Sequence, residues 1–454
     1  MKKINIFLLF VASIALSGAE ITVLHTTDTH GELTADPETV AMFAANTVPN
    51  RTLTVDCGDL IQGGYETFQD RGAAAVGALN KLGFNVWVAG NHDLDFGLET
   101  YRKRVGEFNG TVLAGNWKLD GESSIAWRMF ELDGVKVAVI GMGREDQNVR
   151  SYHPGFNVEC EDEAAALARI VPEVKAAGAN VIILARHAGN YDRTGGLWAI
   201  ASKFPDIDLV LGGHTHQDEP GEASAKVFFA QAGSHAARLG VVKIEVDDAT
   251  GRVVQISGRL VGLPGKAPEP DDSKLVAELP TRLITPTRRS TTNLLCWTAA
   301  SAMLDLTGAD AAFYGGRAGG LDYPARVTER VLFSMFPYSD EVGVAEFSMA
   351  ELTALLQEQL DEFGASPYSL SVAGLRVMTD GDRKITQIFP IKDRYSVALT
   401  SFSAIGANGK FSPVNGFRSS GVLLRDVVRR YLASGKFCTA DGWLELKKQK
   451  NAKK

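Results

Sequence analysis

The sequence has few cysteines and no excess of positive charge. Cys57, Cys160, Cys296 and Cys438 stand far apart in 454 residues, so three disulfide pairings stay open and none is favoured. The formal net charge is −7, which offers no basic surface to a nucleic-acid polymer. We therefore expect no binding of DNA or RNA, and we expect any small anionic substrate to be held by local groups.

Long hydrophobic runs are also missing after the N-terminus, so no segment is long enough to cross a bilayer. At the N-terminus, Lys2 and Lys3 precede an apolar stretch over residues 4–16, and the small residues 17–19 follow it. This pattern is typical of a signal peptide. No cysteine stands near the expected cleavage site, so a lipid anchor is not indicated there. We expect residues 1–19 to be removed and the mature chain, without a transmembrane anchor, to be bacterial and periplasmic or secreted.

What the sequence does contain is a set of metal-type residues behind five short apolar runs. The runs are residues 21–24, 53–55, 86–88, 181–184 and 209–211, and the residues that follow them are Asp28 with His30, Asp59, Asn91 with His92, His187, and His214 with His216. Short, β-branched runs of this kind indicate buried strands of a parallel sheet. Loops that leave the carboxyl ends of such strands meet in one crevice, so we expect these side chains to converge.

The residue types predict both the metals and the reaction. Imidazoles with carboxylates and one amide suit divalent Mn, Zn, Fe or Co, and no thiolate stands among them. Asp59 is suited to bridge two cations, because a carboxylate has two oxygens. Two such metals acidify a water and bind the oxygens of a phosphoryl group, so phosphoester hydrolysis is the expected reaction.

These motifs resemble the calcineurin-like metallophosphoesterases. The resemblance is carried by Asp28-x-His30, Gly58-Asp59, Gly90-Asn91-His92-Asp93, His187 and Gly213-His214-Thr215-His216. The longer strings at residues 24–31 and 90–97 are similar to the bacterial 5'-nucleotidase/UDP-sugar hydrolase branch, and the likeness is dense from about residue 20 to about 262. It implies an α/β sandwich, with two mixed sheets flanked by helices, and a smaller α+β C-terminal domain.

The resemblance also implies a role for each site residue. One metal would take Asp28, His30, Asp59 and His216, and the other would take Asp59, Asn91, His187 and His214. His92 and Asp95 match the catalytic dyad of the family, in which the imidazole assists phosphoryl transfer and the carboxylate orients the ring. A cation held by a carboxylate fits that role physically.

Other polar residues have a simpler interpretation. Isolated histidines such as His25, His153 and His235 are more often satisfied core or surface residues than ligands. Cys57 stands two residues before Asp59, and we expect it to be buried as a small hydrophobic residue.

The composition changes after the metal-type motifs. Residues 263–272 contain three prolines and no apolar periodicity, which indicates a linker. We predict a dinuclear metallophosphoesterase domain at 20–262, a linker at 263–290 with a helix-like stretch from 273 to about 279, a substrate-binding domain at 291–446 and a solvated basic tail at 447–454.

The second domain resembles the nucleotidase C-terminal domain more loosely. The family's Asn-Gly-Gly-x-x-Arg loop is replaced by residues 314–322 with Arg317, and its Gly-Gly-Asp-Gly loop is replaced by residues 406–411, where Asn408 keeps hydrogen bonding without the charge. Phe411, with Phe336 or Tyr338, would stack a flat base, although Phe336 and Phe411 are equally well explained as core residues.

The arginines of this domain carry the same two interpretations. Arg317 and Arg376 would pair with a phosphate or lie on the surface, and the surface position is favoured for Arg376.

We therefore expect an exported phosphohydrolase with two divalent metal ions, acting on a small phosphorylated substrate and most simply a 5'-nucleotidase. UDP-sugar hydrolysis and 2',3'-cyclic-nucleotide or 3'-nucleotide hydrolysis are the alternatives, because the metal motifs do not distinguish them. A non-catalytic periplasmic binding protein on the same scaffold would be a different class, but every ligand and both dyad residues are present. A thiosulfohydrolase is a third possibility. The oligomeric state stays open.

Overall fold

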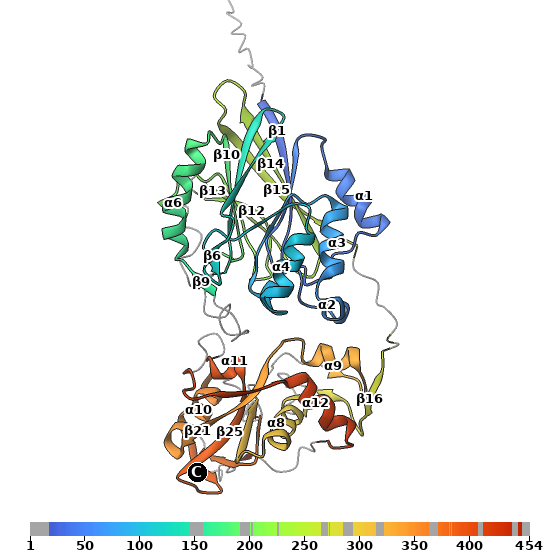
Figure 1. Ribbon diagram of the computed structural model, residues 1–454, viewed down its shortest axis with the longest axis vertical. Coiled ribbons are helices and arrows are strands. Elements are labelled where there is room, and N and C mark those ends of the chain that lie inside the picture. Colours follow the sequence, from blue (N-terminus) through green and yellow to red (C-terminus); the bar gives the residue numbers. More distant parts are fainter. Residues whose placement is uncertain are drawn as a thin grey trace, which may run out of the picture.

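The computed structural model describes residues 18–144, 158–190, 200, 203–224, 227–264, 271, 273–284, 294–314, 322–362, 371–380, 382, 384–406, 412–437 and 444–446. Figure 1 shows two domains one above the other, the first coloured blue to green-yellow and the second yellow-orange to red. Among the described residues no helix is long and apolar enough to cross a membrane.

The N-terminal domain is built on two six-stranded sheets. The first has the order β15 (Val253–Gly262), β14 (Arg238–Asp247), β1 (Gly18–Thr26), β2 (Thr52–Asp56), β3 (Val86–Val88) and β4 (Thr111–Leu113). The second has the order β12 (Asp218–Ser224), β13 (Val227–Ala232), β11 (Leu209–Leu211), β10 (Val181–Arg186), β8 (Val135–Met142) and β7 (Trp127–Leu132). Both sheets are mixed. In the first, β1 to β4 run parallel, and β14 pairs antiparallel with both β1 and β15. In the second, β8, β10, β11 and β13 run parallel, and the edge strands β7 and β12 pair antiparallel with their neighbours. The five predicted strands are β1, β2, β3, β10 and β11.

The two sheets pack face to face, and helices cover their outer faces. Alternate residues of each strand point into the layer between the sheets, where Val23 and Val55 of one sheet meet Val139 and Ile183 of the other. The helices are α1 (Pro37–Asn46), α2 (Tyr65–Asp70), α3 (Ala73–Leu82) and α4 (Leu98–Glu107) beside the first sheet, and α6 (Glu163–Ala176) beside the second. Smaller elements are the 3₁₀ helix η1 (Asn91–Leu94) and the strands β5 (Trp117–Leu119), β6 (Glu122–Ser123) and β9 (Val158–Cys160). The predicted α/β sandwich is confirmed.

The C-terminal domain is a smaller α+β unit. Its main sheet has the order β22 (Ser371–Ala373), β18 (Ala311–Tyr314), β25 (Arg394–Thr400), β21 (Glu341–Ser348) and β26 (Arg418–Leu423). One face packs against α8 (Leu294–Thr307) and α12 (Leu424–Ala433), and the other packs against α10 (Met349–Glu362). The remaining elements are β19 (Asp322–Tyr323), β20 (Arg326–Thr328), α9 (Glu329–Met335), β23 (Arg376–Thr379), β24 (Ile385–Phe389), α11 (Ser401–Ala404) and β27 (Leu444–Leu446).

The segment between the domains differs from the sequence prediction. The stretch predicted to be helix-like forms strand β16 (Leu275–Glu278), which pairs antiparallel with β20, and β17 (Leu283–Ile284) pairs with β19. A short apolar run does not distinguish helix from strand by periodicity, and here the main-chain partner comes from later in the chain. These residues therefore belong to the C-terminal domain. At the other end, β1 begins at Gly18, two residues before the predicted start of the domain.

The domains contact each other through α2 and α9. Tyr65 and Phe68 of α2 lie against the ring of Phe333 on α9, with ring centroids 6.1 Å and 5.2 Å away. Arg330 of α9 pairs with Glu66 of α2. Since α2 begins six residues after Asp59, this contact lies next to the metal-type motifs.

Candidate active site

Backbone strain marks the predicted metal ligands. Asp28, His30, Asp59, His214 and His216 have φ of 48°, 49°, 55°, 71° and 57°. This left-handed conformation is uncommon for residues other than glycine, and it persists only where the surroundings impose it. Five of the seven predicted ligands adopt it, which indicates that the loops are shaped to bring their side chains together.

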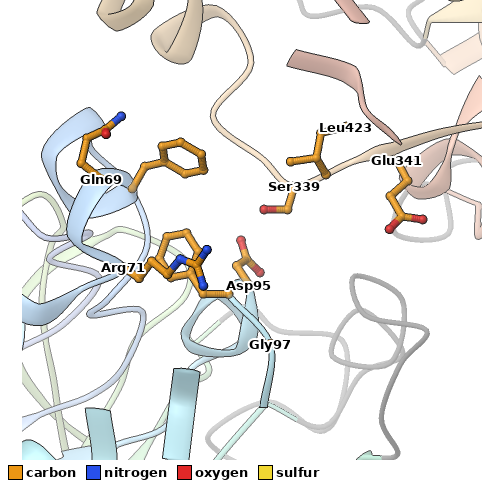
Figure 2. Close-up of a pocket in the computed structure, with 9 residues that line it drawn as sticks. Gln69, Arg71, Asp95, Gly97, Ser339, Glu341 and Leu423 are labelled. Atoms are coloured by element: carbon orange, nitrogen blue, oxygen red, sulfur yellow. The ribbon is translucent and has the colours of Figure 1, made fainter. Parts of the chain in front are cut away.

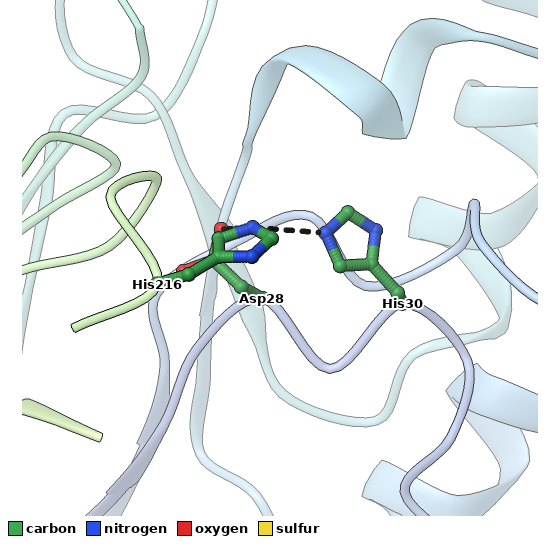
Figure 3. Close-up of side chains that lie close together, drawn as sticks. All are labelled: Asp28, His30 and His216. Atoms are coloured by element: carbon green, nitrogen blue, oxygen red, sulfur yellow. Dashed lines mark hydrogen bonds and ion pairs between the residues drawn. The ribbon is translucent and has the colours of Figure 1, made fainter. Parts of the chain in front are cut away.

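Asp28, His30 and His216 form the first of two candidate metal-binding groups, and Figure 3 shows Asp28 and His30 on one loop and His216 reaching them from another. One ligand atom from each lies within 4.8 Å of the others. The Nε2 atoms of His30 and His216 are 3.3 Å apart, and His216 Nε2 is 3.4 Å from Asp28 Oδ1. His30 Nδ1 donates to the main-chain oxygen of Gln62 at 2.8 Å, which orients its Nε2 toward the group.

The second group contains Asp59, His187 and His214, again with one ligand atom each within 4.8 Å. His187 Nδ1 donates to the Cys57 oxygen at 2.7 Å, and its Nε2 lies 3.1 Å from Asp59 Oδ2. The amide oxygen of Asn91 lies 3.1 Å from His214 Nδ1. The structure therefore brings all seven predicted ligands into two adjacent groups.

The donor sets fit divalent cations. The Nε2 atom of His187 is buried and faces two carboxylates, Asp59 at 3.1 Å and Asp28 at 3.8 Å. Burial lowers the pKa of His187, but the nearby carboxylates of Asp59 and Asp28 outweigh it and raise the pKa to about 9. The site therefore attracts positive charge, which two metal ions would supply.

His92 and Asp95 form a hydrogen-bonded pair beside these groups. His92 Nδ1 donates to Asp95 Oδ2 at 2.9 Å, and the His92 main-chain N–H donates to Asp59 Oδ1 at 2.8 Å. Burial lowers the pKa of His92, but the Asp95 and Asp59 carboxylates raise it to about 10. The two carboxylates therefore favour the protonated ring, with Nδ1 occupied by Asp95.

Asp93 supports the loops of the site, a role that the sequence did not reveal although the residue stands in one of the motifs. It is fully buried, and its carboxylate accepts hydrogen bonds from the main-chain N–H groups of Asp59, Leu60, Ile61 and Gly90 and from Trp87 Nε1. It thereby ties the loop after β2 to the loop after β3. Gly90 must be glycine, because a Cβ there would lie 2.3 Å from the Asp59 nitrogen.

The remaining histidines separate into two kinds. His25 is completely buried in the core without a hydrogen-bond partner among the described residues, and burial lowers its pKa to about 4. His235 instead lies at the site, stacked on His30 with ring centroids 5.1 Å apart and its Nδ1 2.9 Å from Glu32 Oε1. More than 200 residues separate His235 from His30, so no local signal indicated this contact. His153 lies outside the described residues.

Of the four predicted substrate-binding residues, Arg317, Asn408 and Phe411 lie outside the described residues. Phe336 is 3% exposed and packs in the core of the C-terminal domain, as its alternative interpretation had it.

The neighbouring Tyr338 is 39% exposed, and its ring stacks on His92 with centroids 5.5 Å apart and an interplanar angle of 25°. Of Phe336 and Tyr338, the structure therefore places Tyr338 at the site.

A pocket of about 470 Å³ lies between the domains beside the dyad. Figure 2 shows Gln69, Arg71 and Asp95 of the N-terminal domain facing Ser339, Glu341 and Leu423 of the C-terminal domain. The rings of Phe68 and Phe96 also line it. The C-terminal domain therefore forms part of the space next to the reactive groups.

Comparisons with known proteins agree with this geometry. Residues 21–218 match the family model for calcineurin-like phosphoesterases, and residues 276–415 match the model for the 5'-nucleotidase C-terminal domain. A NAD 5'-nucleotidase from Haemophilus influenzae is 32% identical over 169 residues, which cover 36% of this chain and 27% of that protein. A 5'-nucleotidase from Rattus norvegicus is 27% identical over 286 residues, which cover 53% of this chain and 48% of that protein. This chain thus spans about half or less of the length of these relatives.

Solved structures share the whole fold. A 5'-nucleotidase precursor from Thermus thermophilus has a TM-score of 0.68 at 20% identity, covering 94% of this chain and 99% of that one. A sulfate thiohydrolase from the same organism has a TM-score of 0.62 at 18% identity, covering 94% and 97%. At these identities the likeness shows the fold alone. With both of its parts matched in order, the chain belongs to the 5'-nucleotidase family, a calcineurin-like phosphoesterase domain followed by a 5'-nucleotidase C-terminal domain.

Proposed function

We propose that the protein is a dinuclear-metal phosphohydrolase that releases phosphate from nucleotides, most simply from nucleoside 5'-monophosphates. The observation that carries the proposal is the position of the His92–Asp95 pair next to two Asp/His groups. His92 connects the pair to the second metal-binding group, because its main-chain N–H donates to Asp59 while its ring donates to Asp95.

The metals would be held by the two groups already described. Asp28, His30 and His216 would hold one cation, and Asp59, His187 and His214 the other, with Asn91 beside the second group. We further propose that Asp59 would help to hold both cations, because a carboxylate has two oxygens. When bound, divalent ions would acidify a water and offset the negative charge of the phosphoryl group. Mn, Zn, Fe and Co all suit such donors.

His92 would act as the proton donor. The bond from Nδ1 to Asp95 fixes the ring, and we propose that Nε2 is the nitrogen that faces the substrate. The Asp95 and Asp59 carboxylates raise the pKa of His92 and so favour the protonated ring, which would stabilise phosphoryl charge and give its proton to the leaving oxygen. Asp95, 2% exposed, would keep the ring in this orientation.

The leaving group would face the C-terminal domain. Tyr338 presents a half-exposed ring next to His92, and a nucleobase stacked on such a ring gains about 1–3 kcal/mol. A nucleotide suits this arrangement because it carries a phosphoester at one end and a flat ring at the other. UDP-sugars and cyclic nucleotides share these features and are the alternatives.

We also propose that the protein is exported. The support is the pattern of residues 1–19, a basic start, an apolar stretch and a small-residue end. Cleavage after Ala19 would remove only the first two residues of β1. N-terminal sequencing of the protein from the periplasm or the medium would test this, and an intact Met1 would contradict it.

Phosphate release tests the activity. The mature protein, reconstituted with Mn²⁺, would be assayed on AMP, UDP-glucose, 2',3'-cyclic AMP, 3'-AMP and a phosphoester without a base, with His92→Ala as the control. We expect release that requires both the metal and His92 and that favours one nucleotide. Full metal loading with no release from any substrate would contradict the proposal and would favour a binding role or sulfur-ester hydrolysis.

A further inference from the structure

The segment after Asp59 wraps around the metal-type ligand His30. His30 Nδ1 donates to the main-chain oxygen of Gln62 at 2.8 Å, and the Gly64 N–H donates to the main-chain oxygen of His30 at 3.2 Å. Gly63 between them has no room for a side chain, because a Cβ there would lie 2.2 Å from the His30 oxygen. The main chain at residues 62–64 is therefore fixed against His30.

The side chain of Gln62 makes a contact in the opposite direction, to the other domain. It is 3% exposed, and its Nε2 donates to the main-chain oxygen of Pro337 at 3.1 Å. The preceding carbonyl, that of Phe336, accepts a hydrogen bond from Arg425 Nη1 at 2.7 Å. Two successive carbonyls of this loop are thus held, one by the N-terminal domain and one by α12 of its own domain.

Tyr338 follows directly in the chain. Its ring stacks on that of His92, with centroids 5.5 Å apart and an interplanar angle of 25°. Because the Pro337 carbonyl carbon is bonded to the Tyr338 nitrogen, a shift of the loop at Pro337 would move the ring relative to His92. Gln62 is thus hydrogen-bonded to a metal-type ligand through its main chain and to the Tyr338 loop through its side chain.

We propose that Gln62 is a positioning residue that sets the Tyr338 ring against His92, and thereby sets the affinity for substrates whose leaving group carries a flat ring. This inference rests on the proposed nucleotidase function. The Gln62 side chain would act through Tyr338 and would leave the metal groups unchanged, since the bond to His30 uses its main-chain oxygen.

The test compares two substrates in one variant. Gln62→Leu removes the amide with little change of volume. We expect the KM for AMP to rise about fivefold to tenfold, as for the loss of one hydrogen bond, with kcat within about twofold. The KM for glycerol 2-phosphate, which has no ring, should stay within about twofold. Gln255→Leu, the same change at an exposed position of β15, is the matched control and should alter neither substrate.

Two further measurements separate positioning from a structural defect. Mn²⁺ affinity, measured by titration calorimetry, should be the same in Gln62→Leu and in the unsubstituted protein. In a Tyr338→Ala background, Gln62→Leu should change the KM for AMP by less than about twofold, because the residue through which it acts is gone. Additive effects in this cycle, or equal losses on both substrates, would overturn the inference.

The outcome for the unsubstituted protein distinguishes the two proposals. If it hydrolyses AMP and Gln62→Leu behaves like Gln255→Leu, only the role of Gln62 is overturned. If it neither binds nor hydrolyses any nucleotide, the proposed function fails, and the role of Gln62 fails with it.

Discussion

The guanidinium carbon of Arg425 lies 4.1 Å from the ring centroid of Phe68, although the two residues belong to different domains. Phe333 lies on the same guanidinium at 4.7 Å, and Arg425 is only 2% exposed. A cation that faces two neighbouring rings and is shielded from water is strongly attracted to both. This contact therefore holds α2 against the C-terminal domain beside the active site.

Replacing Phe68 by alanine should loosen the domains. The variant loses ring packing and one cation–π contact, together worth about 1–3 kcal/mol. We expect a larger radius of gyration by small-angle X-ray scattering. Phe130→Ala on β7, a partly buried phenylalanine far from α2, should leave the scattering profile unchanged. Identical profiles for Phe68→Ala and the unsubstituted protein would show that this contact does not hold the domains.

Removing the Asp95 charge should change the pH profile of hydrolysis. His92 is protonated below its pKa, so its activity as an acid is present at lower pH and is lost as the pH rises through that pKa. The Asp95 and Asp59 carboxylates raise this pKa to about 10. In Asp95→Asn the alkaline fall in kcat should therefore move to lower pH by about one unit or more. An unmoved alkaline limb would mean that another group sets it.

Single-ligand variants should lose one metal and keep the other. His187→Ala removes one donor of the second group, and His216→Ala removes one donor of the first. Elemental analysis after dialysis should find about one metal per chain in each variant and two in the unsubstituted protein. Loss of both metals in both variants would show that the groups bind cooperatively instead.

Removal of metal should also lower the thermal stability. Asp28 and Asp59 are buried at 0% and 1% exposure, with their negative charges close together. A ligand that binds only the folded state stabilises it by mass action. Treatment with EDTA should therefore lower Tm, and added Mn²⁺ should restore it. An unchanged Tm would argue against stoichiometric metal binding.

Asp208 should make the folded state less stable as the pH rises. Its Oδ2 accepts the Ile182 N–H at 2.9 Å, and burial raises its pKa to about 6. Between about pH 4 and 6 the Asp208 carboxyl is still protonated in the folded state but has lost its proton in the unfolded state. The free energy of unfolding therefore falls as the pH rises through this window. The side chain introduced by Asp208→Asn does not titrate. Between pH 4 and 7 the free energy of unfolding of this variant should therefore rise by about 2–3 kcal/mol relative to that of the unsubstituted protein. Urea unfolding at several pH values measures this, and parallel curves would refute it.

Local sequence patterns were sufficient to predict those features that depend on a single strand and the loop after it. The five strands that end in metal-type residues were predictable because buried parallel strands are short, β-branched runs, and their carboxyl ends meet at one edge. The His92–Asp95 pair was likewise predictable, since the two residues are only three positions apart in the chain.

Prediction failed where the partner came from a distant part of the chain. Residues 275–278 form a strand because β20 supplies their main-chain partners about 50 residues later. Phe336 and Tyr338 are both aromatic and almost adjacent, yet one is core and the other lies on His92. Only the orientation of the loop after α9 distinguishes them.

The sequence alone determined the chemistry of this protein, because the types and order of the ligands specify which groups converge at the end of a parallel sheet. The tertiary structure alone decided what surrounds them. His235 on His30, Asp93 beneath two loops and Gln62 against Pro337 are contacts between groups that only packing brings together. Such contacts depend on how sheets and domains pack, and no local periodicity encodes that.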